Sequence, residues 1–128
     1  MATEILYHGA NGDRILGILT NGAMAPRDGK IFFAANRWES ALMHGADTRR
    51  VASFVIKIEV QIPGDVIRYR TATAGVADTI VLQTTQPVSV RVLELYARKP
   101  ATGGFQVQHV IGPEAIRHYL GERLDYRV

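Results

Sequence analysis

The clearest hydrophobic pattern in the chain is a strict alternation over residues 54–62. Apolar side chains occupy every second position of this stretch, namely Phe54, Ile56, Ile58, Val60 and Ile62. Three of the four residues between them are polar, and the fourth is Val55. Because successive side chains of a strand point to opposite faces, this pattern predicts a strand with one face in the core.

Shorter runs rich in apolar and β-branched residues predict further strands at 4–8, 30–34, 66–70, 79–84, 88–96 and 105–111. Pro63-Gly64 favours a tight turn after residues 54–62, so we predict that 54–62 and 66–70 form an antiparallel hairpin. Residues 71–77 are mostly small, and we expect them to form a loop.

The pattern changes to a helical period after Asn11. Asn11 or Asp13 can cap the start of this predicted helix, and Asn21-Gly22 can supply a left-handed exit from it. Its apolar face is formed by Ile15, Leu16, Ile18 and Leu19. The segment therefore predicts a helix of about two turns.

Two more helices are expected. Asn36 with Glu39 three residues later has the form of a capping box, and this helix would end at His44-Gly45. Pro113 suits the first position of a last helix that Gly121 would close. Early helices followed by mostly antiparallel strands indicate the α+β class. At 128 residues, the chain has the size of one domain, residues 1–128.

Composition narrows the chemistry. The chain has no cysteine, which excludes disulfides and thiolate metal ligands. Its net charge of +3 and its pI near 9.5 are compatible with an anionic ligand. It lacks a basic and then apolar N-terminal stretch, and no apolar run approaches the ~20 residues that span a bilayer. We therefore expect a cytoplasmic protein with no membrane partner.

Among the four histidines, His8 stands out because Gly9 follows it and lets a ligand approach the backbone. His109 and His118 are expected to be packed and hydrogen-bonded. The histidines lack the spacing of a metal site, so no metal ligands are assigned. Serine-hydrolase, P-loop and dinucleotide-fingerprint motifs are also absent from the sequence.

Four strings within roughly the first 45 residues resemble the NAD-binding half of the ADP-ribosyltransferases. They are Tyr7-His8-Gly9-Ala10, Ile15-Leu16-Gly17-Ile18-Leu19 with Gly22, Gly29-Lys30-Ile31-Phe32-Phe33-Ala34, and Ser40-Ala41. In the poly(ADP-ribose) polymerase-like branch the matching strings are His-Gly-Thr, Ile-Leu-x-x-Gly-Leu, Gly-x-Tyr-Phe-Ala and Ser-Ala-x-Tyr. The predicted strand at 54–62 falls where the family has its next strand.

The resemblance implies a role for each residue of the first string. His8 would hydrogen-bond the adenosine ribose of NAD. Gly9 would hold the nicotinamide amide through its backbone, and Ala10 would complete this part of the NAD site. In this interpretation His8 is both a binding and a catalytic residue.

The resemblance places the nicotinamide pocket on later residues. Phe32 falls on the first aromatic residue of the family's Tyr-Phe-Ala, and Phe33 follows it in the site. Because the two alternate along one strand, we expect Phe32 to line the cleft and Phe33 the core. The tyrosine that stacks on the nicotinamide falls on Met43, beside His44, and either side chain can cover an aromatic ring.

The third family position is an acidic residue at the head of a late strand. The string Asp78-Thr79-Ile80-Val81-Leu82 is similar to the family's Glu-Tyr-Ile-Val-Tyr, which implies that Asp78 is catalytic. A carboxylate there would stabilise the positive charge that grows on the ribose as nicotinamide leaves. The alternative interpretation is that Asp78 is a turn residue.

The family fold is a split β-sandwich of two facing, mostly antiparallel sheets with short helices, and NAD lies in the split. The resemblance therefore implies a mono-ADP-ribosyltransferase that transfers ADP-ribose from NAD to a protein or nucleic-acid acceptor, as a small bacterial or phage toxin or effector. One alternative is a non-catalytic module that binds NAD or ADP-ribose. Another is a relative of the RNA 2′-phosphotransferases, whose phosphate-binding candidates here are Arg14, Arg27, Arg37, Arg49 and Arg50.

Overall fold

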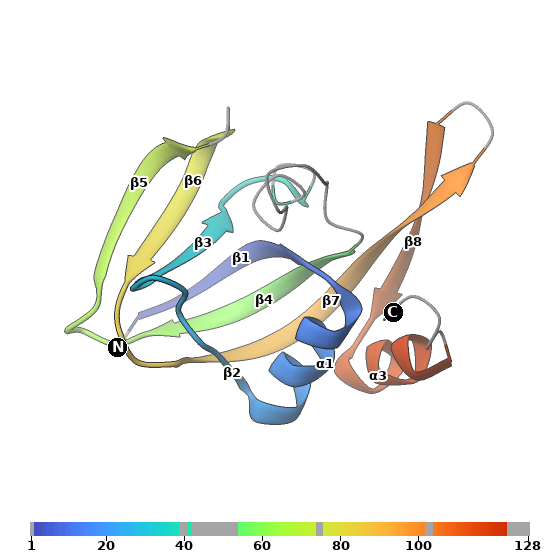
Figure 1. The fold of residues 1–128 in the computed structure, drawn as a ribbon, viewed down its shortest axis with the longest axis horizontal. Helices are drawn as coiled ribbons and strands as arrows, with labels where there is room; N and C mark the ends of the chain where they lie inside the picture. The colour runs from blue at the N-terminus through green and yellow to red at the C-terminus, as the bar shows by residue number, and fades with distance from the viewer. Residues whose placement is uncertain (1, 39–40, 42–53, 74–75, 102–103, 123–128) are drawn as a thin grey trace.

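The computed structural model describes residues 2–38, 41, 54–73, 76–101 and 104–122. Figure 1 shows how its helices and strands are arranged. In chain order the elements are β1 Ala2–Ala10, α1 Gly12–Asn21, β2 Ala23–Met24, β3 Lys30–Ala34, β4 Phe54–Ile62, β5 Ile67–Thr73, β6 Val76–Gln83, β7 Val88–Ala101, β8 Gly104–Ile111 and α3 Pro113–Glu122.

The strands form one sheet in the order β2-β7-β4-β1-β3-β6-β5, and β8 pairs with β7. Each of these described strand pairs is antiparallel. Together with α1 and α3, this sheet confirms the predicted α+β class. The described residues show one sheet, and the two facing sheets that the resemblance implies are not shown.

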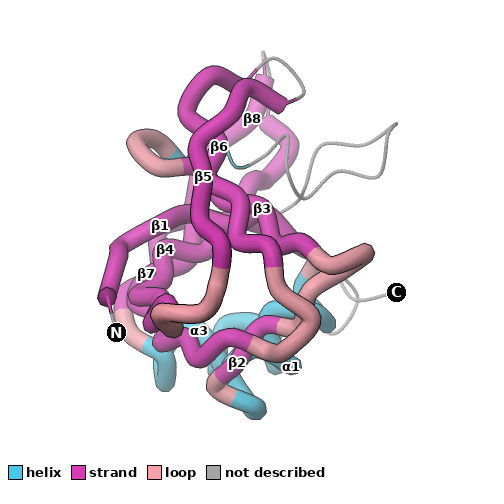
Figure 2. Tube along the Cα trace, turned by 90° about the vertical axis from the view of Figure 1, so that its left-hand side faces the viewer, coloured by secondary structure: helices cyan, strands magenta, loops and turns pink. Residues whose placement is uncertain are grey.

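Among the described strand pairs, β1 and β3 have the fewest paired residues. β1 pairs with β4 along its whole length, from Ala2 opposite Ile62 to Ala10 opposite Phe54. In contrast, the register between β1 and β3 rests on one pair, Tyr7 opposite Ala34. This junction joins the strands β2, β7, β4 and β1 to the strands β3, β6 and β5. In Figures 1 and 2 the hairpin of β5 and β6 stands away from β4 and β7.

Both parts of the sheet contribute to one hydrophobic core. The alternating side chains of β4 are buried in this core, as the sequence predicts. The other members come from both helices, from β1, β2 and β7, and from the β3–β6 pair, and they include Ile15, Ile18, Phe33, Ile80, Ile116 and Leu120. Burial of this apolar surface is the main favourable contribution to folding.

Helix α1 begins and ends as the sequence predicts. The Asn11 side chain accepts a hydrogen bond from the backbone N–H of Arg14 at 2.9 Å, which caps the start of the helix. Gly22 has a φ of 64°, and its N–H donates to the carbonyl of Ile18 at 2.8 Å. This left-handed conformation favours glycine because it has no Cβ.

The predicted hairpin between residues 54–62 and 66–70 is wrong. β4 pairs with β1 and β7, whereas β5 pairs with β6. The chain does turn after Pro63, whose carbonyl accepts from the N–H of Val66 at 3.1 Å, but it leads to the other end of the sheet. β4 lies between the long strands β1 and β7, and Val55 on its second face is fully buried. β5 lies at the edge.

The predicted loop at 71–77 is wrong for residues 71–73 and 76–77, and residues 74–75 lie outside the described residues. β5 continues to Thr73 and β6 begins at Val76, and these two residues are paired. β7 likewise extends past the predicted end at Tyr96 and includes Pro100. β4 pairs with β7 only as far as Ala97. Beyond Ala97, β8 is the one described strand that pairs with β7. A proline is tolerated there because no second strand needs its missing N–H.

The outcomes for the remaining helices differ. α3 begins at Pro113 as predicted but extends one residue past Gly121, to Glu122. Most of the helix that is predicted to follow Asn36 lies outside the described residues.

A pair of glycine substitutions tests the assignment of the α1 boundaries. Gly17→Ala should raise the free energy of unfolding by about 0.5–1 kcal/mol, because alanine is the better helix former and a Cβ at this position meets no atom within 4 Å. Gly22→Ala should lower it by about 1–2 kcal/mol because of the positive φ. Urea unfolding measures both changes, and shifts of the same sign would contradict Gly22 as the helix exit.

Candidate functional site

His8 lies near the end of β1 with only 6% of its surface exposed. Its Nδ1 is 2.8 Å from the backbone carbonyl oxygen of Phe32. Since a carbonyl oxygen only accepts, Nδ1 carries the hydrogen and donates it. In the neutral ring the acceptor lone pair is then on Nε2. The structure thus fixes the tautomer and orientation of this imidazole by a bond from β1 to β3.

The two phenylalanines of β3 lie on opposite faces of the strand. Phe33 is fully buried, and its ring centroid is 5.8 Å from that of His8. Phe32 is half-buried and lies opposite Val81 of β6. The sequence predicts this division into a core residue and a more open one. However, the ring that contacts His8 is that of Phe33, the residue expected in the core.

Gly9 and Ala10 continue β1 as buried residues opposite Val55 and Phe54 of β4. They lead directly to Asn11, the cap of α1. Met43 and His44, the candidates for covering the nicotinamide, lie outside the described residues.

Asp78 is half-buried in β6 and holds the chain where it leaves β3. Its Oδ2 accepts a hydrogen bond from the backbone N–H of Asn36 at 3.0 Å, and its carbonyl oxygen accepts from that of Ala35 at 3.0 Å. The side chain therefore has a clear structural role. The register between β5 and β6 shifts between the pairs Thr71–Thr79 and Thr73–Val76, so Asp78 lies in an irregular part of β6.

His8, Phe33 and Asp78 come from three segments that are far apart in the sequence. Their strands β1, β3 and β6 are consecutive neighbours in the sheet. The ring contact between His8 and Phe33 places these two side chains on one face, and Asp78 lies on the next strand of the sheet.

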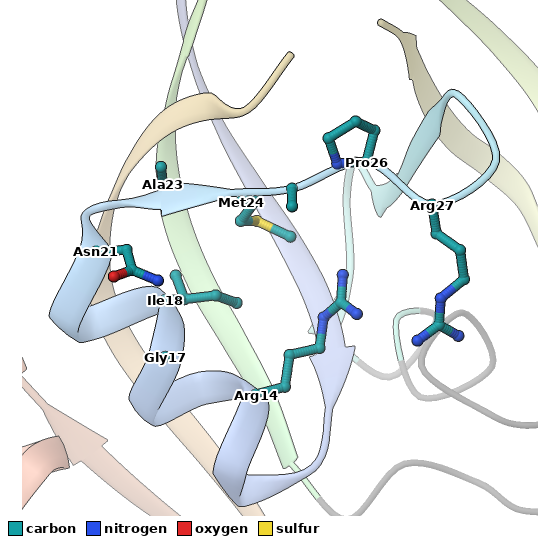
Figure 3. A pocket seen from close by; sticks show the side chains of 9 residues that line it. Arg14, Gly17, Ile18, Asn21, Ala23, Met24, Pro26 and Arg27 are labelled. Atoms are coloured by element: carbon teal, nitrogen blue, oxygen red, sulfur yellow. The ribbon is translucent and has the colours of Figure 1, made fainter. Parts of the chain in front are cut away.

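A pocket that the sequence does not reveal lies between α1 and residues 23–27 (Figure 3). Its volume is about 360 Å³, and its lining includes Arg14, Ile18, Met24, Pro26 and Arg27. Arg14 and Arg27 are two of the five arginines considered as phosphate ligands. Of the other three, Arg37 does not line this pocket, and Arg49 and Arg50 lie outside the described residues.

The guanidinium of Arg14 is in an unusual electrostatic environment. Its Nε is buried and has no hydrogen-bond partner within the described structure. Burial, and secondly the positive charge of Arg27, lower the pKa of Arg14 from its ordinary value. Two cationic groups therefore face one pocket without a counter-ion from its described lining, which has no acidic residue.

An aromatic cluster lies on the face of the sheet opposite to His8. Trp38 stacks on Tyr96 with ring centroids 5.1 Å apart, and Tyr96 stacks on His109 at 4.5 Å. His109 Nε2 is 3.2 Å from the carboxylate of Glu94, which is also 3.3 Å from Lys57 Nζ. His109 is thus packed and paired, as its sequence context predicts.

Within the ranges that the structure describes, no group of three or more histidine, cysteine, aspartate or glutamate residues could hold a metal ion. In the same part of the chain, no helix has the length and apolar character that crossing a membrane requires. No protein-family model, curated protein or solved structure matches the chain.

The bond from Asn36 to Asp78 can be tested by stability measurements. Asp78→Ala should lower the free energy of unfolding by about 1 kcal/mol, because the Asn36 N–H loses its acceptor. Asp78→Asn should retain most of the stability, since its amide oxygen can still accept. Chemical unfolding of both variants measures the difference. Equal stability of Asp78→Ala and wild type would show that this hydrogen bond contributes nothing.

Proposed function

We propose that the protein is an NAD-dependent mono-ADP-ribosyltransferase, a glycosyltransferase that uses NAD as its substrate. The observation that carries this proposal is that His8, Phe33 and Asp78 lie on three neighbouring strands, with the rings of His8 and Phe33 in contact. Two of these three positions, His8 and Asp78, are the polar ones that the family resemblance singles out. Their strands are neighbours although seventy residues separate them in the sequence.

In the proposed reaction the bond between the nicotinamide nitrogen and ribose C1′ breaks, and its electron pair leaves with nicotinamide. A nucleophile of the acceptor then bonds to C1′ and loses its proton. The carboxylate of Asp78 stabilises the positive charge on the ribose during this exchange. Its bond to the Asn36 N–H holds one carboxylate oxygen and so orients the other.

His8 binds and orients the substrate in this proposal. The bond from Nδ1 to Phe32 and the contact with Phe33 restrict the imidazole to one orientation. Nε2 is then the atom that bonds a ribose hydroxyl, and Gly9 supplies backbone groups for the nicotinamide amide. Fixing these groups in advance lowers the entropic cost of substrate binding.

The split β-sandwich belongs to the same proposal. It is supported by the single-pair register between β1 and β3, which leaves the two parts of the sheet joined at one narrow junction. Both parts pack on one core, as two sheets that face each other would. In this arrangement NAD lies along the junction, with Phe32, Met43 and His44 as the further candidates for its nicotinamide pocket.

Two other functions have specific support. The structural bond of Asp78 to Asn36 favours a module that binds NAD or ADP-ribose without cleaving it. The pairing of Arg14 and Arg27 at one pocket favours a phosphate-directed enzyme related to the RNA 2′-phosphotransferases. For the transferase, the acceptor is a protein or nucleic acid, and we propose a cytoplasmic toxin or effector with no membrane partner.

Nicotinamide release from NAD tests the proposal, with His8→Asn as the first variant. Asparagine can keep a donor near the position of Nδ1 and so retain the bond to Phe32, but it lacks Nε2. We expect calorimetry to show NAD binding that is at least about tenfold weaker, which is the scale of one lost hydrogen bond. A folded variant with unchanged NAD affinity would remove His8 from the site.

Asp78 separates the enzyme from the binding module. Asp78→Asn keeps the shape but loses the charge, so kcat for nicotinamide release should fall about 10²-fold or more while NAD affinity changes little. Asp78→Glu should retain activity because it restores the residue of the larger family. Asp65→Asn, an exposed position in the turn after β4, is the matched control. Wild-type rates in all Asp78 variants would leave Asp78 with its structural role only.

A further inference from the structure

We propose that the pocket between α1 and residues 23–27 binds a diphosphate group, and that Arg14 and Arg27 are its two anion-binding side chains. This inference does not depend on NAD cleavage. It rests on the charge, burial and shape of the pocket, and it holds for a binding module as well as for an enzyme.

The first observation is the buried Nε of Arg14, which has no hydrogen-bond partner among the described residues. A guanidinium that loses water without gaining a hydrogen-bond acceptor is destabilised. Arg14 is half-buried and reaches the pocket, as Figure 3 shows. A ligand that brings oxygen acceptors into the pocket would pair with the accessible part of this guanidinium, for which the described residues provide no acceptor.

The second observation is that Arg27 adds another positive charge at the same pocket. Burial lowers the pKa of Arg14, and the charge of Arg27 lowers it further, so the two guanidinium groups are close enough to repel each other. An anion between them would attract both guanidinium groups, and these two attractions would outweigh the repulsion. Arg27 is exposed, so it can reach an entering ligand.

Other arginines of the protein provide the contrast. Arg68 is paired with Glu4, Arg91 with Glu59 and Arg117 with Glu114. Each of these pairs satisfies a surface guanidinium within the chain. The described lining of the pocket holds two arginines and no acidic residue, which is the arrangement of a site for an external anion.

The size and walls of the pocket indicate which anion fits. A volume of about 360 Å³ lies at the lower end of the range for small-molecule sites and exceeds what one phosphate group fills. Two guanidinium groups can each bind one phosphate in a bidentate manner. Ile18, Met24 and Pro26 form an apolar wall that can cover the rest of a nucleotide. A nucleoside diphosphate therefore satisfies both parts of the pocket.

Calorimetry with pyrophosphate, orthophosphate and ADP tests the proposal on the full chain. Wild type should bind pyrophosphate more tightly than orthophosphate, because two phosphate groups engage two arginines. Arg14→Gln and Arg27→Gln should each weaken pyrophosphate binding by about tenfold or more. Arg91→Gln removes the same charge from a surface arginine on β7 and should change the affinity by less than about twofold.

The outcomes separate the possible interpretations. ADP binding that is tighter than pyrophosphate binding supports a nucleotide as the ligand, whereas equal affinities support free pyrophosphate. Equal affinity for orthophosphate and pyrophosphate overturns the diphosphate assignment, and equal losses in Arg14→Gln and Arg91→Gln overturn the site itself. Should Arg14→Gln fail to fold, the exposed Arg27→Gln carries the same test. Pyrophosphate binding without nicotinamide release would refute the proposed enzyme and leave this inference intact.

Discussion

The hydrogen bond from His8 Nδ1 to the carbonyl of Phe32 holds together the part of the sheet on which the proposed site depends. β1 and β3 share one register pair, so this partly buried side-chain bond reinforces a junction that has few paired residues. A buried polar group that loses its partner costs about 1–3 kcal/mol, and here both the imidazole and the carbonyl would lose theirs. The position of β3 relative to β1, and through it the position of Asp78 on β6, follows from this junction.

The same histidine thus combines a structural and a functional assignment. Its burial and its bond to β3 are what a packed core histidine would show. The same contacts also fix the ring in one tautomer and one orientation, which a substrate-binding imidazole requires. The two interpretations differ in whether the imidazole also contacts a substrate. Asp78 has a similar dual character because it secures the chain after β3 with one carboxylate oxygen.

Local sequence features predicted local structure well. The alternation at 54–62 and the caps Asn11 and Gly22 were correct, because each depends on residues within one element. The predicted partner of β4 was wrong because β4 pairs with strands that are distant in the sequence, β1 and β7, and a local turn signal after residue 62 does not determine that pairing. Alternation also separated Phe32 from Phe33, but it cannot say which of them contacts His8, since that requires the position of β3 beside β1.

The arginine pocket shows the limit of sequence reasoning most clearly. Arg14 lies on a helix and Arg27 in an irregular segment, so no periodic pattern relates the two positions. They meet because the left-handed exit at Gly22 sends the chain back along α1. The distance in sequence from His8 to Arg14 is short, and it spans the end of β1, the Asn11 cap and the first turn of α1. The proposed ribose-binding and diphosphate-binding groups are therefore connected through one short segment, and a nucleotide that contacts Arg14 is positioned by the same backbone that presents His8.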